Sequence, residues 1–281
     1  MKKYILGLSV VFVVLFAAVT YGQELERWIL VTDPHIPTNE KQGLNSRNVI
    51  GNFKTMTKEV LALDPKPTGV IITGDIANHR GVESDYLMAK RLFQPFETAK
   101  LPLYPLLGNH DRRDPFFSVF PKWKAKSAVP GRHCFELKTK YVDFYMLDSN
   151  NSGESTGELG EAQMTWLEQA MCQPSDKPAV VFLHHDITSL TEKDRIVALA
   201  KKCPRFKAYI FGHIHDPKFC TPTKARPFYY ATLLAISAGP NSTAPYGWND
   251  CTIGPNEMVI TLRTGEPQQE INGTVWRIPL K

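Results

Sequence analysis

Short apolar runs alternate with longer amphipathic stretches along most of the chain after residue 26. Apolar runs bounded by turn formers predict buried strands, and apolar positions spaced three or four residues apart predict helices that pack on a sheet. The strands are expected at residues 28–32, 69–73, 103–107, 141–147, 179–183 and 208–211. The helices between them are expected at residues 45–63, 84–98, 161–172 and 192–202. This alternation predicts right-handed crossovers and a largely parallel α/β sheet covered by helices.

The pattern changes after residue 211, where the amphipathic helical stretches stop. With no helix between them, further strands are expected at residues 228–237, 258–262 and 275–278. Such a succession predicts a more antiparallel layer at the C-terminal end. Turn formers are mixed with aromatic residues in two stretches that are expected to be loops, 112–132 and 239–255. These loops are either a pocket rim or ordinary surface connections.

The chain opens with the features of a secretory signal peptide. Two lysines precede a continuous apolar run at residues 5–19, and small residues follow up to Gly22. We therefore expect residues 1–22 to be removed and residues 23–281 to form one secreted or periplasmic domain. The alternative is an uncleaved anchor, but the run is shorter than the roughly 20 residues that a spanning helix needs. No second long apolar stretch follows, so no membrane span is expected after cleavage.

The composition is that of an ordinary globular protein, with 43% hydrophobic and 22% charged residues. This excludes disordered, collagen-like and coiled-coil classes. Lysine and arginine number 33 against 28 aspartates and glutamates, a formal net charge of +5. Loss of the two signal-peptide lysines leaves about +3, which is too small to indicate nucleic acid or an anionic membrane as a partner. The oligomeric state stays open.

Five cysteines follow the signal peptide, so at least one thiol is unpaired. Cys172 and Cys203 each end a predicted helix just before a strand, which places both at one edge of the sheet and allows them to pair. Cys220 and Cys251 are the other candidate pair. For either pair the alternative is two separate buried thiols. The absence of a Cys-x-x-Cys motif argues against a zinc ribbon or a thioredoxin-like redox site.

Five of the predicted strands end in residues that commonly bind metals. The motifs are Asp33-Pro34-His35, Gly74-Asp75, Gly108-Asn109-His110-Asp111, His184-His185-Asp186 and Gly212-His213-Ile214-His215. They hold six of the eight histidines of the chain. A single histidine after a strand is more often structural. Sites in open α/β sheets form outside the carboxyl ends of the strands, however, so five such endings are expected to converge on one crevice.

Imidazole, carboxylate and amide groups together suit two divalent cations. Two cations about 4 Å apart can stabilise the attacking and leaving oxygens of a displacement at phosphorus. A carboxylate must bridge them, and Asp75 is the natural candidate. The predicted partner is therefore a small phosphorylated substrate. A mononuclear zinc hydrolase is the alternative, but it needs only three protein ligands and leaves Asp33, Asn109 and one imidazole of the Gly-His-x-His motif without a purpose.

In this order and spacing, the motifs resemble those of the calcineurin-like metallophosphoesterase superfamily, over residues 33–215. The resemblance implies a four-layer α/β/β/α sandwich of two mixed sheets flanked by helices, with the C-terminal strands completing the second sheet. It implies two divalent metal ions, with Mn, Fe and Zn all compatible with the ligands. It also implies hydrolysis of phosphomonoesters or small phosphodiesters, cyclic nucleotides included, by a metal-bound hydroxide.

The roles that the resemblance implies are specific to individual residues. The first metal would be held by Asp33, His35 and His215, and the second by Asn109, His184 and His213, with Asp75 as the bridge. His184 is preferred to His185 because the family's ligand directly follows the strand, and the next side chain points the other way. His110 matches the catalytic histidine that assists the leaving group, and Asp111 would orient it.

Departures from the relatives limit the assignment. Purple acid phosphatases have a tyrosine three residues after the bridging aspartate, where this chain has Asn78, so a ferric tyrosinate centre is not expected. The bacterial cyclic-nucleotide phosphodiesterases have similar motifs but are usually cytoplasmic, so the substrate stays open. A non-catalytic scaffold, like the retromer subunit with this fold, is the alternative, which the complete ligand set disfavours. Residues after the ligand motifs either contact the substrate or are solvated: Asn78, His79, Arg80, Arg112 and Arg113.

Overall fold

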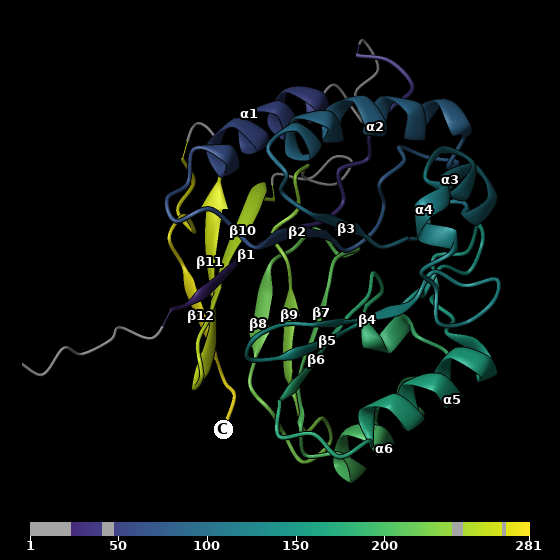
Figure 1. Ribbon diagram of the computed structural model, residues 1–281, viewed down its shortest axis with the longest axis vertical. Helices are drawn as coiled ribbons and strands as arrows, with labels where there is room; N and C mark the ends of the chain where they lie inside the picture. The colour runs from purple at the N-terminus through teal and green to yellow at the C-terminus, as the bar shows by residue number, and fades with distance from the viewer. Residues whose placement is uncertain (1–23, 41–47, 238–243, 266–267) are drawn as a thin grey trace, which may run out of the picture.

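A computed structural model describes residues 24–40, 48–237, 244–265 and 268–281. The expected signal peptide, residues 1–22, lies outside the described residues. Two six-stranded mixed sheets pack face to face, with helices on both outer faces (Figure 1). The α/β/β/α sandwich expected from the sequence is thereby confirmed. No helix in the described ranges is long and apolar enough to cross a membrane.

The first sheet has the strand order β12-β11-β10-β1-β2-β3. Its strands are β1 (Glu26–Val31), β2 (Gly69–Ile72), β3 (Leu103–Pro105), β10 (Gly247–Ile253), β11 (Glu257–Thr264) and β12 (Val275–Pro279). The first three are parallel to one another, and the last three form an antiparallel meander. The C-terminal strands therefore complete the first sheet and not the second, as had been expected, because β10 pairs antiparallel with β1.

The second sheet has the order β4-β5-β6-β7-β9-β8. Its strands are β4 (Phe135–Lys138), β5 (Asp143–Met146), β6 (Ala179–Phe182), β7 (Phe206–Phe211), β8 (Lys218–Cys220) and β9 (Tyr229–Thr232). The four central strands are parallel, and β4 and β8 are antiparallel edges. The carboxyl ends of β5, β6 and β7 therefore lie at one edge of this sheet.

Helices cover the outer face of each sheet (Figure 1). The first sheet carries α1 (Val49–Leu61) and α2 (Glu83–Thr98), and the second carries α5 (Gly160–Met171) and α6 (Lys193–Lys202). Helix α1 begins at Val49, four residues later than expected, and its N-cap is Asn48, whose side chain accepts a hydrogen bond from the Gly51 amide. Its buried positions, Phe53, Met56 and Val60, recur at helical spacing and pack into the core.

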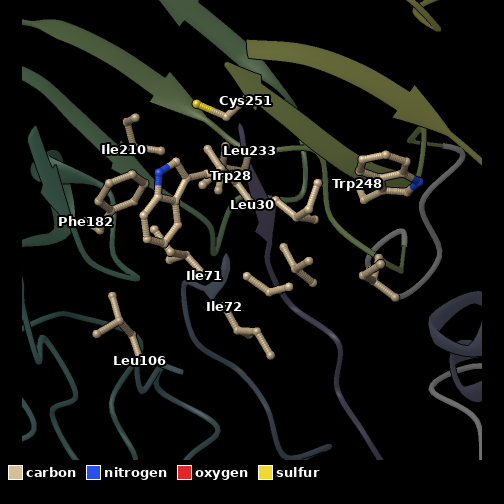
Figure 2. Close-up of a cluster of buried hydrophobic side chains, with 14 of the residues drawn as sticks. Trp28, Leu30, Ile71, Ile72, Leu106, Phe182, Ile210, Leu233, Trp248 and Cys251 are labelled. Atoms are coloured by element: carbon tan, nitrogen blue, oxygen red, sulfur yellow. The ribbon is translucent and has the colours of Figure 1, made fainter. Parts of the chain in front are cut away.

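Every second residue of the central strands in the second sheet faces the core between the sheets. Phe144, Val180 and Ile210 face the first sheet, whereas their neighbours Tyr145 and Val181 face α5 and α6 in a second cluster. Figure 2 shows part of the inner cluster, in which Trp28, Ile71, Phe182 and Ile210 come from both sheets. The ring of Trp28 on β1 lies 5.4 Å from that of Phe144 on β5. These two rings thus pack directly against each other across the space between the sheets.

Both stretches expected to be loops contain regular structure. Residues 112–132 include the short helices α3 (Arg113–Val119) and α4 (Pro121–Lys124), and their aromatic residues Phe116 and Trp123 are buried. Most of the described part of 239–255 is strand β10. Its polar residues suggested a loop, but they are satisfied inside the sheet: the Asn249 amide donates to the carbonyls of Leu30 and Leu234, each at 3.0 Å.

Two of the five cysteines form a disulfide, and the other three are free thiols. Cys172 and Cys203 form a disulfide, with their Cα atoms 6.0 Å apart, at the edge of the second sheet where β6 and β7 begin. This confirms the pairing that the strand order allowed. Cys220 and Cys251 are both free thiols, so the second candidate pair does not form in this structure.

Candidate metal centre

The carboxyl ends of β1, β2, β3, β6 and β7 meet at one edge of the sandwich, as their sequence motifs predicted. Backbone hydrogen bonds link the loops that follow the strands: His35 N donates to Asp75 O at 2.9 Å, and Gly212 N donates to His184 O at 3.1 Å. The loops after β1 and β2 thus lie side by side in the first sheet, and so do the loops after β6 and β7 in the second. Their side chains enter a shared space between the sheets.

Asp33 has one satisfied and one unsatisfied carboxylate oxygen. Its Oδ2 accepts hydrogen bonds from Thr32 Oγ1 at 2.6 Å and from His213 N at 3.0 Å. Its Oδ1 is buried without a hydrogen bond from any described residue. That oxygen lies 3.1 Å from His215 Nε2 and 3.7 Å from His35 Nε2. A buried carboxylate oxygen that faces two imidazole nitrogens is the arrangement that a cation would satisfy.

Asp75 occupies the middle of the site. Its Oδ1 accepts a hydrogen bond from the His110 amide at 2.9 Å. Its Oδ2 lies 3.3 Å from His184 Nε2, 3.8 Å from His35 Nε2 and 3.9 Å from His110 Nε2. This one oxygen therefore faces imidazoles that come from both sheets.

Backbone carbonyls orient three of the imidazoles. The Nδ1 atoms of His35, His184 and His215 lie 3.3, 3.1 and 2.9 Å from the carbonyl oxygens of Asn78 and Thr73, which follow β2, and of Ser237, which follows β9. A carbonyl can only accept, so each Nδ1 carries a proton and each Nε2 is the nitrogen that faces the site. His184 Nε2 also lies 3.1 Å from Asn109 Oδ1.

His213 and His185 are held differently. The His213 ring packs 5.1 Å from the His184 ring and 4.9 Å from the His185 ring. No hydrogen bond from the described residues reaches the His213 ring. His185 is buried, and its Nδ1 lies 2.8 Å from the hydroxyl oxygen of Ser149. The structure thus places His184, and not His185, at the two carboxylates.

Backbone strain is concentrated in these loops. Six non-glycine residues in the described ranges have positive φ, and five are site residues, with φ between 42° and 67°: Asp33, His35, Asp75, His213 and His215. The left-handed conformation is unfavourable by roughly 1–3 kcal/mol for each such residue, and it persists where the surrounding structure holds the side chain in place. The strained backbone at these five residues therefore indicates that the loops hold their side chains in fixed positions.

Burial and mutual charge together set the pKa values in the site. Burial alone would raise the pKa of the Asp33 carboxyl, but the imidazoles of His215 and His184 outweigh it and hold that pKa well below its usual range. Burial lowers the pKa of His35 to about 4, so this ring is neutral near pH 7. Burial also opposes protonation of His184, but Asp75 and Asp33 raise its pKa to about 9. His184 would therefore release a proton when a cation binds.

The residues present fit two cations. Three groups of ligand-type atoms each lie within 4.8 Å of one another: Asp33 with His35 and His215, His35 with Asp75 and His110, and Asp33 with Asp75 and His184. Asp33 and Asp75 recur in these groups and connect them. Carboxylate and imidazole donors of this kind suit divalent ions such as Mn²⁺, Fe²⁺ and Zn²⁺.

Comparison with known proteins agrees with this geometry. The family model of the calcineurin-like phosphoesterases matches residues 27–217, which include all five motifs. The chain belongs to the calcineurin-like phosphoesterase family. It is thus a metal-dependent phosphoric ester hydrolase, and the site described above is its candidate catalytic centre.

Individual relatives of this phosphoesterase are distant. A probable glycerophosphodiester phosphodiesterase of Arcobacter nitrofigilis is 28% identical over 203 residues, covering 66% of this chain and 71% of the relative. A 3',5'-cyclic adenosine monophosphate phosphodiesterase of Vibrio vulnificus is 22% identical over 266 residues, covering 86% of this chain and 90% of the relative. The crystal structure of a dimetal phosphatase from Danio rerio superposes with a TM-score of 0.70 at 12% identity, covering 91% of this chain and 99% of that one, which shows the shared fold.

Asp111 of the phosphoesterase does not orient His110, contrary to the expectation. No hydrogen bond joins this carboxylate to the imidazole in the described structure. Its two oxygens instead accept hydrogen bonds, at 2.9 to 3.1 Å, from the amides of Ile76, Ala77 and Gly108 and from the hydroxyl of Tyr86. Asp111 therefore braces the loops after β2 and β3 against each other, and its oxygens are fully used in doing so.

Two of the arginines that follow ligand motifs also have structural partners. Arg113 forms a bidentate ion pair with buried Asp148, at 2.7 and 3.0 Å. Arg112 Nη1 donates to the carbonyls of Asn109 and Asp111 at 3.0 and 2.7 Å. Arg80 is exposed and has no partner among the described residues.

Strand β5 also ends in polar residues, which its sequence pattern could have indicated. This strand is followed by Asp148, Ser149 and Asn150, all buried. The Asn150 side-chain amide donates to the carbonyl of Gly108 through a short hydrogen bond and to that of Asp111 at 2.9 Å.

The sequence contains three glycosylation sequons, which begin at Asn150, Asn241 and Asn272. Asn241 falls outside the described residues, whereas Asn150 is buried. Its burial is incompatible with a glycan in the folded protein.

Proposed function

We propose that the protein is an exported enzyme that hydrolyses small phosphodiesters with two divalent metal ions. The observation that carries the proposal is the pair of buried carboxylates at the carboxyl ends of β1 and β2. Asp33 Oδ1 has no hydrogen bond from a described residue, and Asp75 Oδ2 faces three imidazoles. A complete set of ligands with an unsatisfied buried oxygen has no purpose in a protein-binding scaffold.

Each ligand has a place in this proposal. The first ion would be held by Asp33, His35 and His215, and the second by Asn109, His184 and His213, with Asp75 between them. When bound, such a pair supplies positive charge to the phosphoryl oxygens and acidifies water. Identity of the ions depends on availability, because several divalent metals accept this donor set.

His110 is placed to act on the substrate. Its side chain is 27% exposed, more than those of Asp33, His35, Asp75, His184 and His215, so the ring borders the opening of the site. Its Nε2 lies 3.9 Å from Asp75 Oδ2. A protonated imidazole there can hold a phosphoryl oxygen and deliver its proton to the leaving oxygen.

The charges around the site favour a diester over a monoester. A phosphomonoester carries between one and a half and two negative charges near neutral pH, roughly one more than a diester, and it calls for additional cationic partners. Arg113 is paired with Asp148 and so does not offer a free guanidinium to the phosphate, and Arg112 Nη1 is used to hold the carbonyls of Asn109 and Asp111. Similarity to proteins named as glycerophosphodiester and cyclic-nucleotide phosphodiesterases supports the same assignment.

Export is supported by two independent features. The basic and apolar pattern of residues 1–22 is that of a signal peptide, and a disulfide joins Cys172 to Cys203. Disulfides persist in oxidising compartments outside the cytoplasm. Mass spectrometry of the protein recovered from the host's periplasm or medium tests export, and an intact N-terminus on protein confined to the cytoplasm would refute it.

Hydrolysis of two chromogenic esters tests the activity. The purified protein is stripped with a chelator, resupplied with Mn²⁺, and assayed on bis-p-nitrophenyl phosphate and p-nitrophenyl phosphate. Diester hydrolysis is expected to depend on Mn²⁺ and to be lost in Asp75→Asn. The matched control is Asp216→Asn, which changes an exposed carboxylate one residue beyond His215. Preference for the monoester would make the protein a phosphatase, and turnover that survives chelation or the Asp75 substitution would refute the metal site.

A further inference from the structure

The loop at residues 108–111 carries both Asn109 and His110 and is held from the side of the first sheet. The His110 amide donates to Asp75 Oδ1 at 2.9 Å, and the Gly108 amide donates to the Asp111 carboxylate at 2.9 Å. These bonds fix the backbone N–H groups of the loop. Its carbonyl groups have partners from the same stretch of chain: that of Gly108 accepts from the Asp111 amide at 3.1 Å, and those of Asn109 and Asp111 accept from Arg112 Nη1 at 3.0 and 2.7 Å.

The His110 ring has no anchor of its own. Its Nδ1 is buried without a hydrogen bond from any described residue, unlike the Nδ1 atoms of His35, His184 and His215. The ring packs edge-on against the His35 ring at 4.9 Å. Its position is therefore inherited from the backbone of the loop, so whatever fixes the loop also fixes the imidazole.

Asn150 adds two hydrogen bonds to this loop from the second sheet. Its side-chain amide donates both hydrogens, one to the carbonyl of Gly108 and one to that of Asp111, the residues on either side of Asn109 and His110. Asn150 is only 1% exposed, so water does not compete for these bonds. One side chain thus closes the loop at both of its ends.

Asn150 is itself held rigidly. Its amide N donates to Asp148 Oδ1 at 3.1 Å, and its carbonyl accepts from Arg113 Nη2 at 2.6 Å. Arg113 in turn forms the bidentate ion pair with Asp148. The ion pair thus fixes the backbone of Asn150, and the Asn150 side chain transmits that position to the loop.

We propose that Asn150 is the positioning residue for Asn109 and His110, linking the second sheet to the loop that carries one expected metal ligand and the expected proton donor. The inference rests on the proposed function and adds a residue to its site. Without the Asn150 amide, each of the two carbonyls keeps only its partner within residues 108–112, and the loop loses these two bonds to the second sheet, so it relaxes away from the position set by Asp75. Binding at the second metal position and turnover should then weaken together.

The test compares Asn150→Ala with Asn249→Ala as a matched control. Asn249 is also buried, and its amide also donates to two carbonyls, those of Leu30 and Leu234, but it does not touch the loop. Asn150→Ser, whose hydroxyl keeps one donor near the loop, serves if the alanine variant does not fold. The measurements are calorimetric titration of the stripped protein with Mn²⁺, kcat and KM for bis-p-nitrophenyl phosphate, and the thermal midpoint.

For the Asn150 variants, we expect about tenfold or greater loss of Mn²⁺ affinity at one of two sites and about tenfold lower kcat, with KM within about threefold. Asn249→Ala should melt earlier but keep its Mn²⁺ affinity and kcat. Asn150 variants that melt earlier and keep both would show that the residue is merely structural, and this overturns the proposal. If the wild-type protein hydrolyses neither ester, the proposed function fails, and the Mn²⁺ titrations still decide the role of Asn150.

Discussion

Removal of the disulfide between Cys172 and Cys203 should destabilise the fold without affecting the metal centre. The bond joins the ends of α5 and α6, where β6 and β7 begin, whereas the site lies at the opposite, carboxyl ends of the strands. A change at this edge reaches the ligands only through the length of the strands. Stability and catalysis should therefore separate in the double variant Cys172→Ser/Cys203→Ser.

The magnitude follows from the length of the closed loop. The two cysteines are 31 residues apart in sequence. In the chain-entropy description, a crosslink of that span reduces the entropy of the unfolded chain by an amount equivalent to about 4 kcal/mol at 25 °C. A folded domain is commonly stable by roughly 5–15 kcal/mol, so the double variant should still fold but with a much smaller margin.

Urea unfolding followed by tryptophan fluorescence measures the effect. The control is Cys220→Ser, which removes a free, partly exposed thiol on β8 and should leave the free energy of unfolding nearly unchanged. Mn²⁺ affinity and diester turnover at 25 °C should match the wild-type values in both variants. A loss below about 1 kcal/mol would refute the entropic reasoning. A loss of Mn²⁺ binding in the folded double variant would refute the separation of the two edges.

Three further predictions concern buried polar groups. Asp111→Asn replaces an acceptor of four hydrogen bonds by a group with two donors, and should lower the free energy of unfolding in urea by about 3 kcal/mol; unchanged stability would contradict the bracing role. Arg113→Lys loses the bidentate pair with Asp148 and should lower stability by about 2 kcal/mol with KM unchanged, whereas a raised KM at full stability would indicate contact with the substrate. Burial lowers the pKa of His133 below its ordinary value of about 6.5, so the unfolded chain takes up a proton there that the folded protein does not. The stability that this neutral ring contributes is present above pH 6.5 and is lost as pH falls. Between pH 7.5 and 5.5 the free energy of unfolding of wild type should therefore fall relative to that of His133→Phe. A difference between the two proteins that is independent of pH would refute this.

Some of the misplaced elements show why local pattern was insufficient. Strand β10 was expected to be a loop because turn formers are mixed with aromatic residues there, but the side chains of Asn249 and Asp250 find partners within the sheet, in Leu30 and Arg27 respectively. Its pairing with β1 also placed the C-terminal meander in the first sheet. Partner choice between strands far apart in sequence depends on how the whole chain folds, and local periodicity contains no information about it.

The sequence by itself determined the α/β layers, the family and the residues that end the strands, because apolar runs and the polar residues directly after them are local features of the chain. Convergence of Asp33 and Asp75 followed from the rule that parallel strands present their carboxyl ends at one edge, whereas His184 reaches them from the other sheet through the packing of the two sheets. Only the tertiary structure decided what each polar group bonds. Asp111 braces backbone amides, Arg113 pairs with Asp148, and the Asn150 amide closes the loop that carries His110, because a hydrogen bond is set within a few tenths of an ångström by loops from separate strands.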